Sequence, residues 1–130
     1  MIIVLDSNEY IDYLEKKFEI LNEILSNEET IVYINEIIVK ETSRNIGELK
    51  KKGFYSLLSR RTFIVHNQKI PFHMLQKYKK LGLKKGNIGI AAFCEYVKAN
   101  YLITENRHFL KSKNFDKFKV LSIKEFLNKI

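Results

Sequence analysis

The side chains of this sequence that can do chemistry together are oxygen ligands spread along the chain: Asp6, Glu41, Asn87, and the neighbours Glu105 and Asn106. Carboxylates that converge on one point repel one another unless a cation or protons intervene. No set of cysteines and histidines has the spacing of zinc ligands, so an all-oxygen group favours Mg²⁺ or Mn²⁺. If the fold brings these residues together, the sequence predicts a site for a hard divalent cation.

The apolar pattern indicates how the fold would do this. Short apolar runs predict strands at 1–5, 30–34, 62–65, 101–103 and 119–121. The segments between them predict amphipathic helices that begin near residues 9, 35, 48, 71, 87 and 122. Alternating strands and helices favour right-handed crossovers and a parallel sheet covered on both faces. We therefore expect one α/β domain over 1–130, with three α/β/α layers and four to five strands in an order that stays open.

Two of the predicted helices have a marked apolar face. In the first, apolar side chains recur at three- and four-residue spacing from Tyr10 to Leu25, which indicates one helix through that stretch. This stretch has more apolar residues than a single buried helix face would hold. The surplus, Tyr10, Tyr13 and Ile20, favours a homodimer. In the helix at 48–61, the side chains expected to face inward are Leu49, Phe54, Leu57 and Leu58.

The predicted sheet places the oxygen ligands at one edge, because the carboxyl ends of parallel strands lie together. Asp6 ends the first strand, Glu41 lies on the helix after the second, Asn87 opens a helix, and Asn106 follows the fourth strand. Taken singly, these residues have simpler explanations as helix caps, an exposed helix face or a turn. Only the joint arrangement favours a cation site.

Composition and charge bound the class of protein. The 130 residues carry a formal net charge of +8, which favours a polyanionic partner such as nucleic acid, or an acidic protein. The single cysteine, Cys94, lies in an apolar helix and is expected to be a core residue rather than a nucleophile. No signal peptide and no membrane-spanning stretch is expected, so we predict a cytoplasmic protein without a membrane partner.

Basic residues cluster beside the predicted site. Lys84 and Lys85 run directly into the helix that carries Asn87, and Arg107 follows Asn106. We expect these three to bind phosphate, and Ser7 and Thr104 to donate hydrogen bonds to phosphate or to metal-bound water, although helix capping explains the last two equally well. Other basic and aromatic residues either extend this predicted RNA surface or form a solvated basic face with the tyrosines turned to the core: Lys50–Lys52, Tyr55, Arg60, Arg61, Lys77, Tyr78, Lys79, Lys80, His108, Lys111 and Lys113.

Four segments in order along the chain resemble PIN-domain ribonucleases, in particular VapC-like toxins of type II toxin–antitoxin modules. They are IIVLDSN, INEIIVKE, GNIGIAAFCEYVKANYLITENRHF and FKVLSIKEFL. The resemblance implies a Mg²⁺- or Mn²⁺-dependent endoribonuclease with an acidic antitoxin protein as partner. It also implies that Asp6 and Glu41 match the first two family acids, Asn87 the third, and Asn106, with Glu105 beside it, the fourth.

Asn87 departs from the family pattern, which has aspartate at this position. An amide oxygen can bind a hard cation, but it brings no negative charge and cannot act as a base. We therefore expect weaker metal binding and slow or absent hydrolysis. Two explanations stay open: a naturally degenerate site, or a laboratory replacement of aspartate that allows a toxic nuclease to be expressed.

Two other functions compete with the nuclease hypothesis. The first is a catalytically degenerate PIN-like domain that binds RNA or protein, which the two asparagines favour. The second is a flavodoxin-like or response-regulator-like signalling domain, which shares the expected architecture. The second lacks a phosphate-binding loop and a paired acid after the first strand, so we rank it last.

Overall fold

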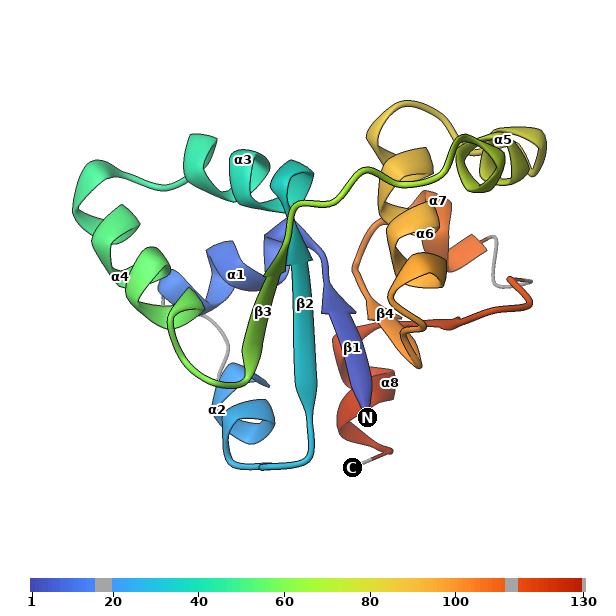
Figure 1. Cartoon of the computed structure of the whole chain (residues 1–130). Helices are drawn as coiled ribbons and strands as arrows, with labels where there is room; N and C mark the ends of the chain where they lie inside the picture. Colours follow the sequence, from blue (N-terminus) through green and yellow to red (C-terminus); the bar gives the residue numbers. More distant parts are fainter. Residues whose placement is uncertain (16–19, 112–114, 130) are drawn as a thin grey trace.

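The computed structural model describes residues 1–15, 20–111 and 115–129, and its centre is a parallel sheet of five strands (Figure 1). The strands are β1 (Ile2–Leu5), β2 (Ile31–Asn35), β3 (Phe63–His66), β4 (Tyr101–Ile103) and β5 (Lys119–Leu121). They lie in the order β3-β2-β1-β4-β5. All five predicted strands are present, and the expected three-layer α/β/α class is confirmed.

Helices follow or connect these strands. They are α1 (Ser7–Leu14), α2 (Ile20–Leu25), α3 (Glu36–Arg44), α4 (Glu48–Leu58), α5 (Phe72–Lys80), α6 (Gly86–Tyr96), α7 (Arg107–Lys111) and α8 (Ile123–Leu127). Polar residues at strand ends begin several of them: the side chains of Asp6, Asn35 and Ser122 each accept a backbone N–H at the start of α1, α3 and α8. The chain therefore turns from strand to helix at the carboxyl edge of the sheet, where the cation site is expected.

The order of the strands reverses beside β1. The chain passes from β1 to β2 and β3, and then returns to the other side of β1 to form β4 and β5. Right-handed crossovers put the helices of the two halves on opposite faces, and Figure 1 shows α1, α2 and α4 on one side of the sheet and α5, α6 and α7 on the other. The loops that follow β1 and β4 diverge at such a reversal and leave a crevice.

This strand order also bears on the signalling hypothesis. It is the order of the first five strands of dinucleotide-binding folds, 3-2-1-4-5-6, and it differs from the flavodoxin-like order 2-1-3-4-5. The segment after β1, Asp6-Ser7-Asn8, contains no glycine, so it lacks the backbone needed to approach a dinucleotide closely. Neither the flavodoxin-like nor the dinucleotide-binding function therefore gains support from the fold.

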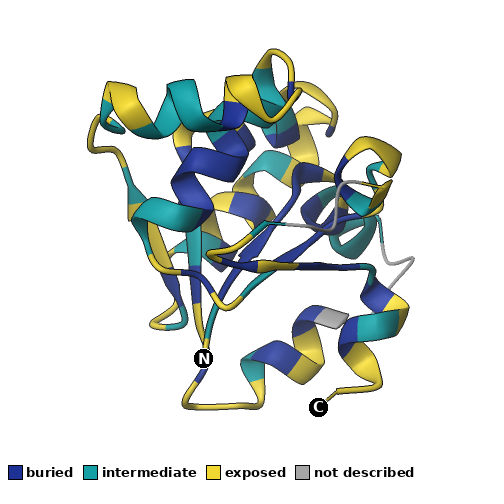
Figure 2. Cartoon of the chain, turned by 90° about the vertical axis from the view of Figure 1, so that its right-hand side faces the viewer, coloured by how far each residue is buried: buried dark blue, intermediate teal, exposed yellow. Residues whose placement is uncertain are grey.

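The core lies on both faces of the sheet. Figure 2 shows the strands mostly buried between helices whose outer turns are exposed. Ile3, Val4 and Leu5 of β1 are completely buried, as expected for a central strand with helices on both sides. Cys94 is also completely buried, and burial raises the pKa of its thiol, so its predicted role as a core residue is confirmed. Within the described ranges, no helix is long and apolar enough to cross a membrane.

Several local predictions are wrong. The helix that begins after Asp6 ends at Leu14, and α2 begins separately at Ile20, so one helix from Tyr10 to Leu25 is not observed. Leu49 is 96% exposed rather than inward-facing. The turn expected after Asn106 leads directly into α7.

The premise of the predicted homodimer is also weakened. Tyr10 is completely buried, and its ring packs edge-on against Phe54 with 5.7 Å between ring centroids. It therefore belongs to the core instead of an exposed face. The side chain of Ile20 lies outside the described part of the chain, and the homodimer stays a prediction. Phe18, on the apolar face predicted from Tyr10 to Leu25, and Lys113, of the predicted RNA surface, also lie outside it.

Candidate functional site

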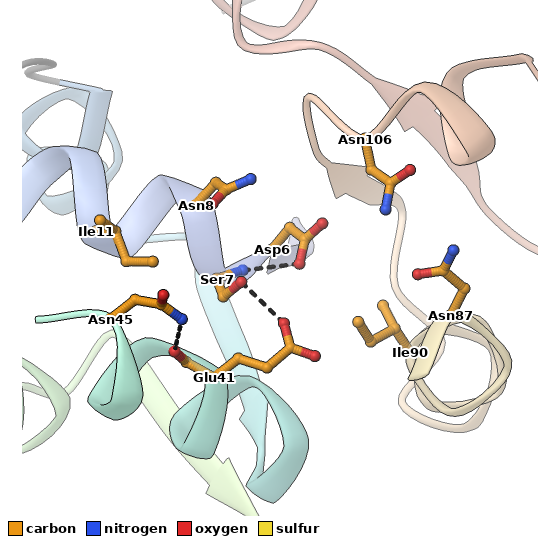
Figure 3. Close-up of a pocket in the computed structure, with 9 residues that line it drawn as sticks. All are labelled: Asp6, Ser7, Asn8, Ile11, Glu41, Asn45, Asn87, Ile90 and Asn106. Carbon is orange, nitrogen blue, oxygen red and sulfur yellow. Dashed lines mark hydrogen bonds between the residues drawn. The ribbon is translucent and has the colours of Figure 1, made fainter. Parts of the chain in front are cut away.

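A pocket of about 400 Å³ opens at the carboxyl edge of the sheet, in the crevice between β1 and β4. Figure 3 shows that its side chains come from α1, α3, α6 and the segment after β4. The lining residues are Asp6, Ser7, Asn8, Ile11, Glu41, Asn45, Asn87, Ile90 and Asn106. The structure therefore brings together four of the five predicted oxygen ligands, which lie up to 100 residues apart in the chain.

Asp6 is the most firmly held of these side chains. It is 6% exposed, and each carboxylate oxygen accepts a hydrogen bond from the protein. The backbone N–H of Ser7 donates to Oδ1 over 2.8 Å, and the hydroxyl of Thr104 donates to Oδ2 over 2.7 Å. Bonds of this kind stabilise the charged carboxylate and fix its direction. The backbone N–H of Asp6 also continues the β1–β4 ladder by donating to Ile103 over 3.0 Å.

Glu41 faces Asp6 from α3 and is tied to the same helix start. Ser7 Oγ donates to Glu41 Oε2 over 3.0 Å, so one residue bonds both carboxylates (Figure 3). A methyl group on Gly86 would lie 3.5 Å from Glu41 Oε1, which puts this oxygen close to the first turn of α6. The N-terminus of a helix favours negative charge, so α6 partly offsets the charge of Glu41. We call Asp6, Ser7 and Glu41 the charged wall.

Asn87 and Asn106 form the opposite wall, which we call the amide wall. Asn106 Oδ1 accepts the backbone N–H of His108 over 2.9 Å and so caps α7. This bond leaves the amide nitrogen of Asn106 to face the pocket, as Figure 3 shows. The assignment follows from the hydrogen bond, since an N–H donor needs an oxygen acceptor. Asn106 therefore presents a hydrogen-bond donor to the pocket, which suits a phosphate oxygen better than a cation.

Glu105, Thr104 and Arg107 are not brought into the pocket. Glu105 Oε1 accepts the backbone N–H of Ile123 over 2.9 Å, so its carboxylate lies at the start of α8. Thr104 is completely buried, and its hydroxyl donates to Asp6 and accepts the backbone N–H of Asn106 over 3.0 Å. Thr104 therefore positions Asp6 and cannot reach a phosphate. Arg107 is exposed and lines none of the described cavities that adjoin Asp6.

A second cavity of about 680 Å³ adjoins the pocket and shares Glu41, Asn87 and Asn106 with it. Its other residues include Lys84, Lys85 and His108. Lys84 and Lys85 are exposed, and neither forms an ion pair with any residue in the described ranges. Their charges are therefore available to a phosphate chain that enters the pocket.

Lys85 also has an unusual backbone. Its φ of 51° and ψ of −130° lie in a region that favours glycine, directly before the first residue of α6. Such conformations cost on the order of 1–3 kcal/mol and persist where the surrounding structure requires them. The strained turn presents Lys85 beside Asn87.

The other residues predicted to contact RNA differ in their exposure and in their partners. Tyr78 is completely buried and donates its hydroxyl to Glu95 over 2.8 Å, so its predicted stacking role is wrong. Lys77 is paired with Glu95 at 2.7 Å and with Asp116 at 3.0 Å, so it is not a free cation. Tyr55 is 52% exposed, so its predicted role in RNA contact stays a prediction.

Sequence reasoning missed one acid close to the site. Glu9 is completely buried on the first turn of α1, and neither carboxylate oxygen has a hydrogen-bond partner among the described residues. Burial, and then the nearby charges of Glu105, Asp12 and Asp6, raise its pKa to about 8. Its spacing from Asp6 is that of a capping box, which predicts an exposed Glu bonded to the N–H of the cap. That N–H is already used by Ile103, so Glu9 loses this role.

The donor set suits a hard cation in kind, although it is short of charge. Within the described ranges, no three His, Cys, Asp or Glu side chains are grouped closely enough to hold a metal ion. Sites for Mg²⁺, however, often use one or two carboxylates together with substrate phosphates and water. Asp6 and Glu41 supply two carboxylates, and the amide oxygen of Asn87 is a further oxygen donor.

Comparison of the chain with protein-family models and with curated protein sequences finds no significant match to either. The fold and the pocket place the chain among three-layer α/β/α proteins that have a polar site where the strand order reverses. The resemblance to PIN-domain ribonucleases stays a hypothesis.

Proposed function

We propose that the chain is a PIN-type endoribonuclease that depends on Mg²⁺ or Mn²⁺, with activity that is weak or absent in this sequence because Asn87 replaces an acid. The observation that carries the proposal is the meeting of Asp6, Glu41, Asn87 and Asn106 in one pocket. Exposed lysines in the adjoining cavity support RNA as the substrate, since RNA is a polyanion.

In this proposal, Asp6, Glu41 and the amide oxygen of Asn87 hold the cation. When bound, a divalent cation supplies a more acidic water and neutralises charge on the scissile phosphate. Ser7 keeps Glu41 directed at the pocket, and Thr104 keeps Asp6 in place, through the hydrogen bonds described above. Both hydroxyls thereby limit the motion of the carboxylates, which lowers the cost of arranging them for reaction.

The substrate strand is held by groups of the amide wall and the second cavity. The amide nitrogen of Asn106 donates to a non-bridging phosphate oxygen, and Lys84 and Lys85 bind the phosphates next to it. His108 lies in the same cavity and is exposed. These groups bind phosphate and sugar and carry little sequence preference of their own.

The test is cleavage of RNA by the Asn87→Asp variant. Purified variant is expected to cut single-stranded RNA with Mg²⁺ or Mn²⁺ and to stop when EDTA is added, whereas the unaltered chain cuts slowly or not at all. Asn87→Gln is the matched control, because it changes the side chain without adding charge. If Asn87→Asp cuts no RNA with either metal, the nuclease proposal fails.

A second candidate is a PIN-like domain that has lost catalysis and binds RNA or protein. The capping bond of Asn106 favours it, because that bond turns a donor toward the pocket where a cation ligand is expected. This candidate predicts RNA binding that weakens with salt and does not respond to Mg²⁺. A clear dependence of binding on Mg²⁺ counts against it.

An acidic antitoxin-type protein is the proposed partner in either case. The net charge of +8 favours an acidic surface, and exposed apolar side chains such as Leu49 and Phe72 add area for protein contact. Neither a bound partner nor a second copy is needed for the pocket, since one chain supplies all its lining residues.

A further inference from the structure

A third cavity, of about 320 Å³, lies at the carboxyl ends of β2 and β3. Figure 1 shows the segment after β3 passing over this edge of the sheet on its way to α5. The lining residues are Asn35, Glu36, Ile37, His66, Asn67, Gln68, Lys69, Ile70 and Phe93. None of them takes part in the pocket of Asp6 and Glu41, so the proposed nuclease chemistry leaves this cavity without a role.

His66 is the centre of the third cavity and sits among aromatic rings. Its ring centroid lies 5.5 Å from that of Phe93, 5.3 Å from that of Tyr96 and 6.4 Å from that of Tyr33. These contacts hold the imidazole in one orientation. Of the three rings only Phe93 lines the cavity, and it is completely buried, so the partly exposed ring of His66 is the one that a ligand can reach. Such a ring can stack on a flat ligand such as a base of a nucleic acid.

Nδ1 of His66 is fully enclosed and has no hydrogen-bond partner among the described residues. A buried N–H without a partner is rarer in proteins than a buried acceptor, which favours Nδ1 without a proton. The proton then lies on Nε2, and the partly exposed ring offers a donor. An oriented donor of this kind suits a carbonyl or a ring nitrogen of a base.

Amide groups surround the ring. Asn35 Oδ1 is used to cap α3 by accepting the N–H of Ile38 over 3.0 Å, so the amide nitrogen of Asn35 remains as a donor. Gln68 Oε1 accepts the hydroxyl of Tyr96 over 3.4 Å, and Asn67 is exposed. Amides with fixed donors and acceptors recognise the polar edge of a base. Glu36 and Lys69 bring opposite charges to the lining, and Glu36 is also paired with Lys40 over 2.8 Å.

The third cavity and the Asp6–Glu41 pocket lie along the same two helices. On α3, Ile37 and Glu41 are four residues apart and so share a face, with one residue in each site. On α6, Asn87 and Phe93 are separated by a rise of about 9 Å. Between the sites the two helices meet closely, since a methyl group on Gly89 would lie 2.7 Å from Ile37 Cδ1. The two sites therefore adjoin the same pair of helices, with this close contact between them.

We propose that the third cavity binds one base of the RNA strand whose phosphate lies between Asp6 and Asn87. The proposal rests on the proposed function for its substrate class, and it makes His66 and Gln68 residues that determine base preference beside the cleaved bond. The ring of His66 stacks with or donates to the base, and the amides of Asn35 and Gln68 read its edge.

The test uses the full chain and hexaribonucleotides in which each position in turn lacks its base. Fluorescence anisotropy in Mg²⁺ is expected to show one position where loss of the base weakens binding about tenfold. His66→Phe keeps an aromatic ring but loses the donor, and Gln68→Ala removes an exposed amide; both are expected to reduce that penalty to about threefold or less. The control is His73→Phe, which alters an exposed histidine of α5 outside the cavity and leaves the penalty unchanged.

The outcomes separate this proposal from the nuclease proposal. If the penalty is the same in His66→Phe and Gln68→Ala as in the unaltered chain, or if no position shows one, the base site is overturned. If Asn87→Asp cuts no RNA while the penalty still depends on His66, the nuclease fails and the base site stands. If Asn87→Asp cuts RNA and its base preference is unchanged by His66→Phe, the nuclease stands and the base site fails.

Discussion

The two walls of the Asp6–Glu41 pocket are built in opposite ways. The charged wall holds its carboxylates with hydrogen bonds from buried or half-buried groups, and Ser7 bonds both of them. The amide wall carries no charge, and Asn106, one of its two side chains, uses its oxygen to cap α7. The pocket therefore has two carboxylates on one wall and two uncharged amides on the other.

The two walls differ because different parts of the fold set the positions of the side chains and the charge that they bring to the pocket. The charged wall depends on the β1–α1 junction and α3: Asp6 caps α1, and Glu41 on α3 is held by the hydroxyl of Ser7. The amide wall depends on the first turn of α6 and the segment after β4, where asparagine and aspartate have almost the same shape. Replacing one by the other changes charge while leaving the backbone as it is.

The largest expected effect is on catalysis from the charged wall. In the Asn87→Asp background, Asp6→Asn is expected to lower RNA cleavage at least about 100-fold, since even changes around a metal ligand commonly cost about 10- to 100-fold. Asn106→Ala in the same background is expected to cost about tenfold or less, because it removes one neutral hydrogen bond to phosphate. Equal losses in single-turnover cleavage rates would mean that the walls do not differ.

The next-largest effect concerns Glu9, the buried acid close to the charged wall, and its influence on stability. The pKa of Glu9 is raised from 4.5 to about 8, so between these values the folded chain binds a proton that the unfolded chain releases. Stability is therefore expected to fall as pH rises from 4.5 to 8, by about 1.4 kcal/mol per pH unit across much of that window.

Urea unfolding at several pH values checks this expectation for Glu9. Glu9→Gln is expected to flatten the pH dependence and to be more stable than the unaltered chain at pH 8. Glu28→Gln, at an exposed position, is the control and keeps the original slope. A stability that rises with pH over this window in the unaltered chain but not in Glu9→Gln would contradict the burial of a protonated Glu9.

A smaller effect separates the two hydroxyls that hold the carboxylates. Thr104→Val leaves a buried oxygen of Asp6 without its donor and is expected to lower the free energy of unfolding by about 1–3 kcal/mol. Ser7→Ala is expected to cost about 0.5–1.5 kcal/mol, because water can replace its hydroxyl at the partly exposed Glu41. Denaturant unfolding of both variants gives the order; a greater cost for Ser7→Ala would show that Glu41 is held more tightly than Asp6.

The smallest effect tests the strained turn before the amide wall. Lys85→Gly is expected to relieve the positive φ and to raise stability by up to about 1 kcal/mol, while it weakens RNA binding by removing a charge. Lys98, with a φ of 58°, stands at the other end of α6 and gives a matched control. Lys98→Gly is expected to give a similar gain in stability with RNA binding unchanged, and an equal loss of binding in both variants would remove Lys85 from the site.

The sequence predicts the strands and helix starts well where apolar runs are short and a helix-capping residue follows them. The strands Tyr101–Ile103 and Lys119–Leu121 match the predicted bounds, and a polar residue follows each of them directly, Thr104 and Ser122. The break between α1 and α2 was missed because apolar spacing continues across it from Tyr10 to Leu25. Strand order was left open, since it depends on contacts between distant segments that leave no local pattern.

The site was predictable as a set of residue types, and less so in its contacts. Asp6 and Glu41 follow strand-to-helix junctions that a local pattern reveals. The orientation of Asn106 depends on a bond to the backbone of His108, and the burial of Glu9 depends on Ile103 taking the N–H of Asp6. Neither contact follows from residue spacing alone.

The central claim is that the amide wall lacks one charge at position 87, and titration with Mn²⁺ tests it most directly. Isothermal calorimetry of the unaltered chain, Asn87→Asp and Asn106→Asp measures the affinity for the ion without requiring any RNA. We expect Asn87→Asp to tighten Mn²⁺ binding at least about tenfold more than Asn106→Asp, since the side-chain oxygen of Asn106 is turned toward its helix cap. Equal tightening by both variants, or none by Asn87→Asp, would contradict it.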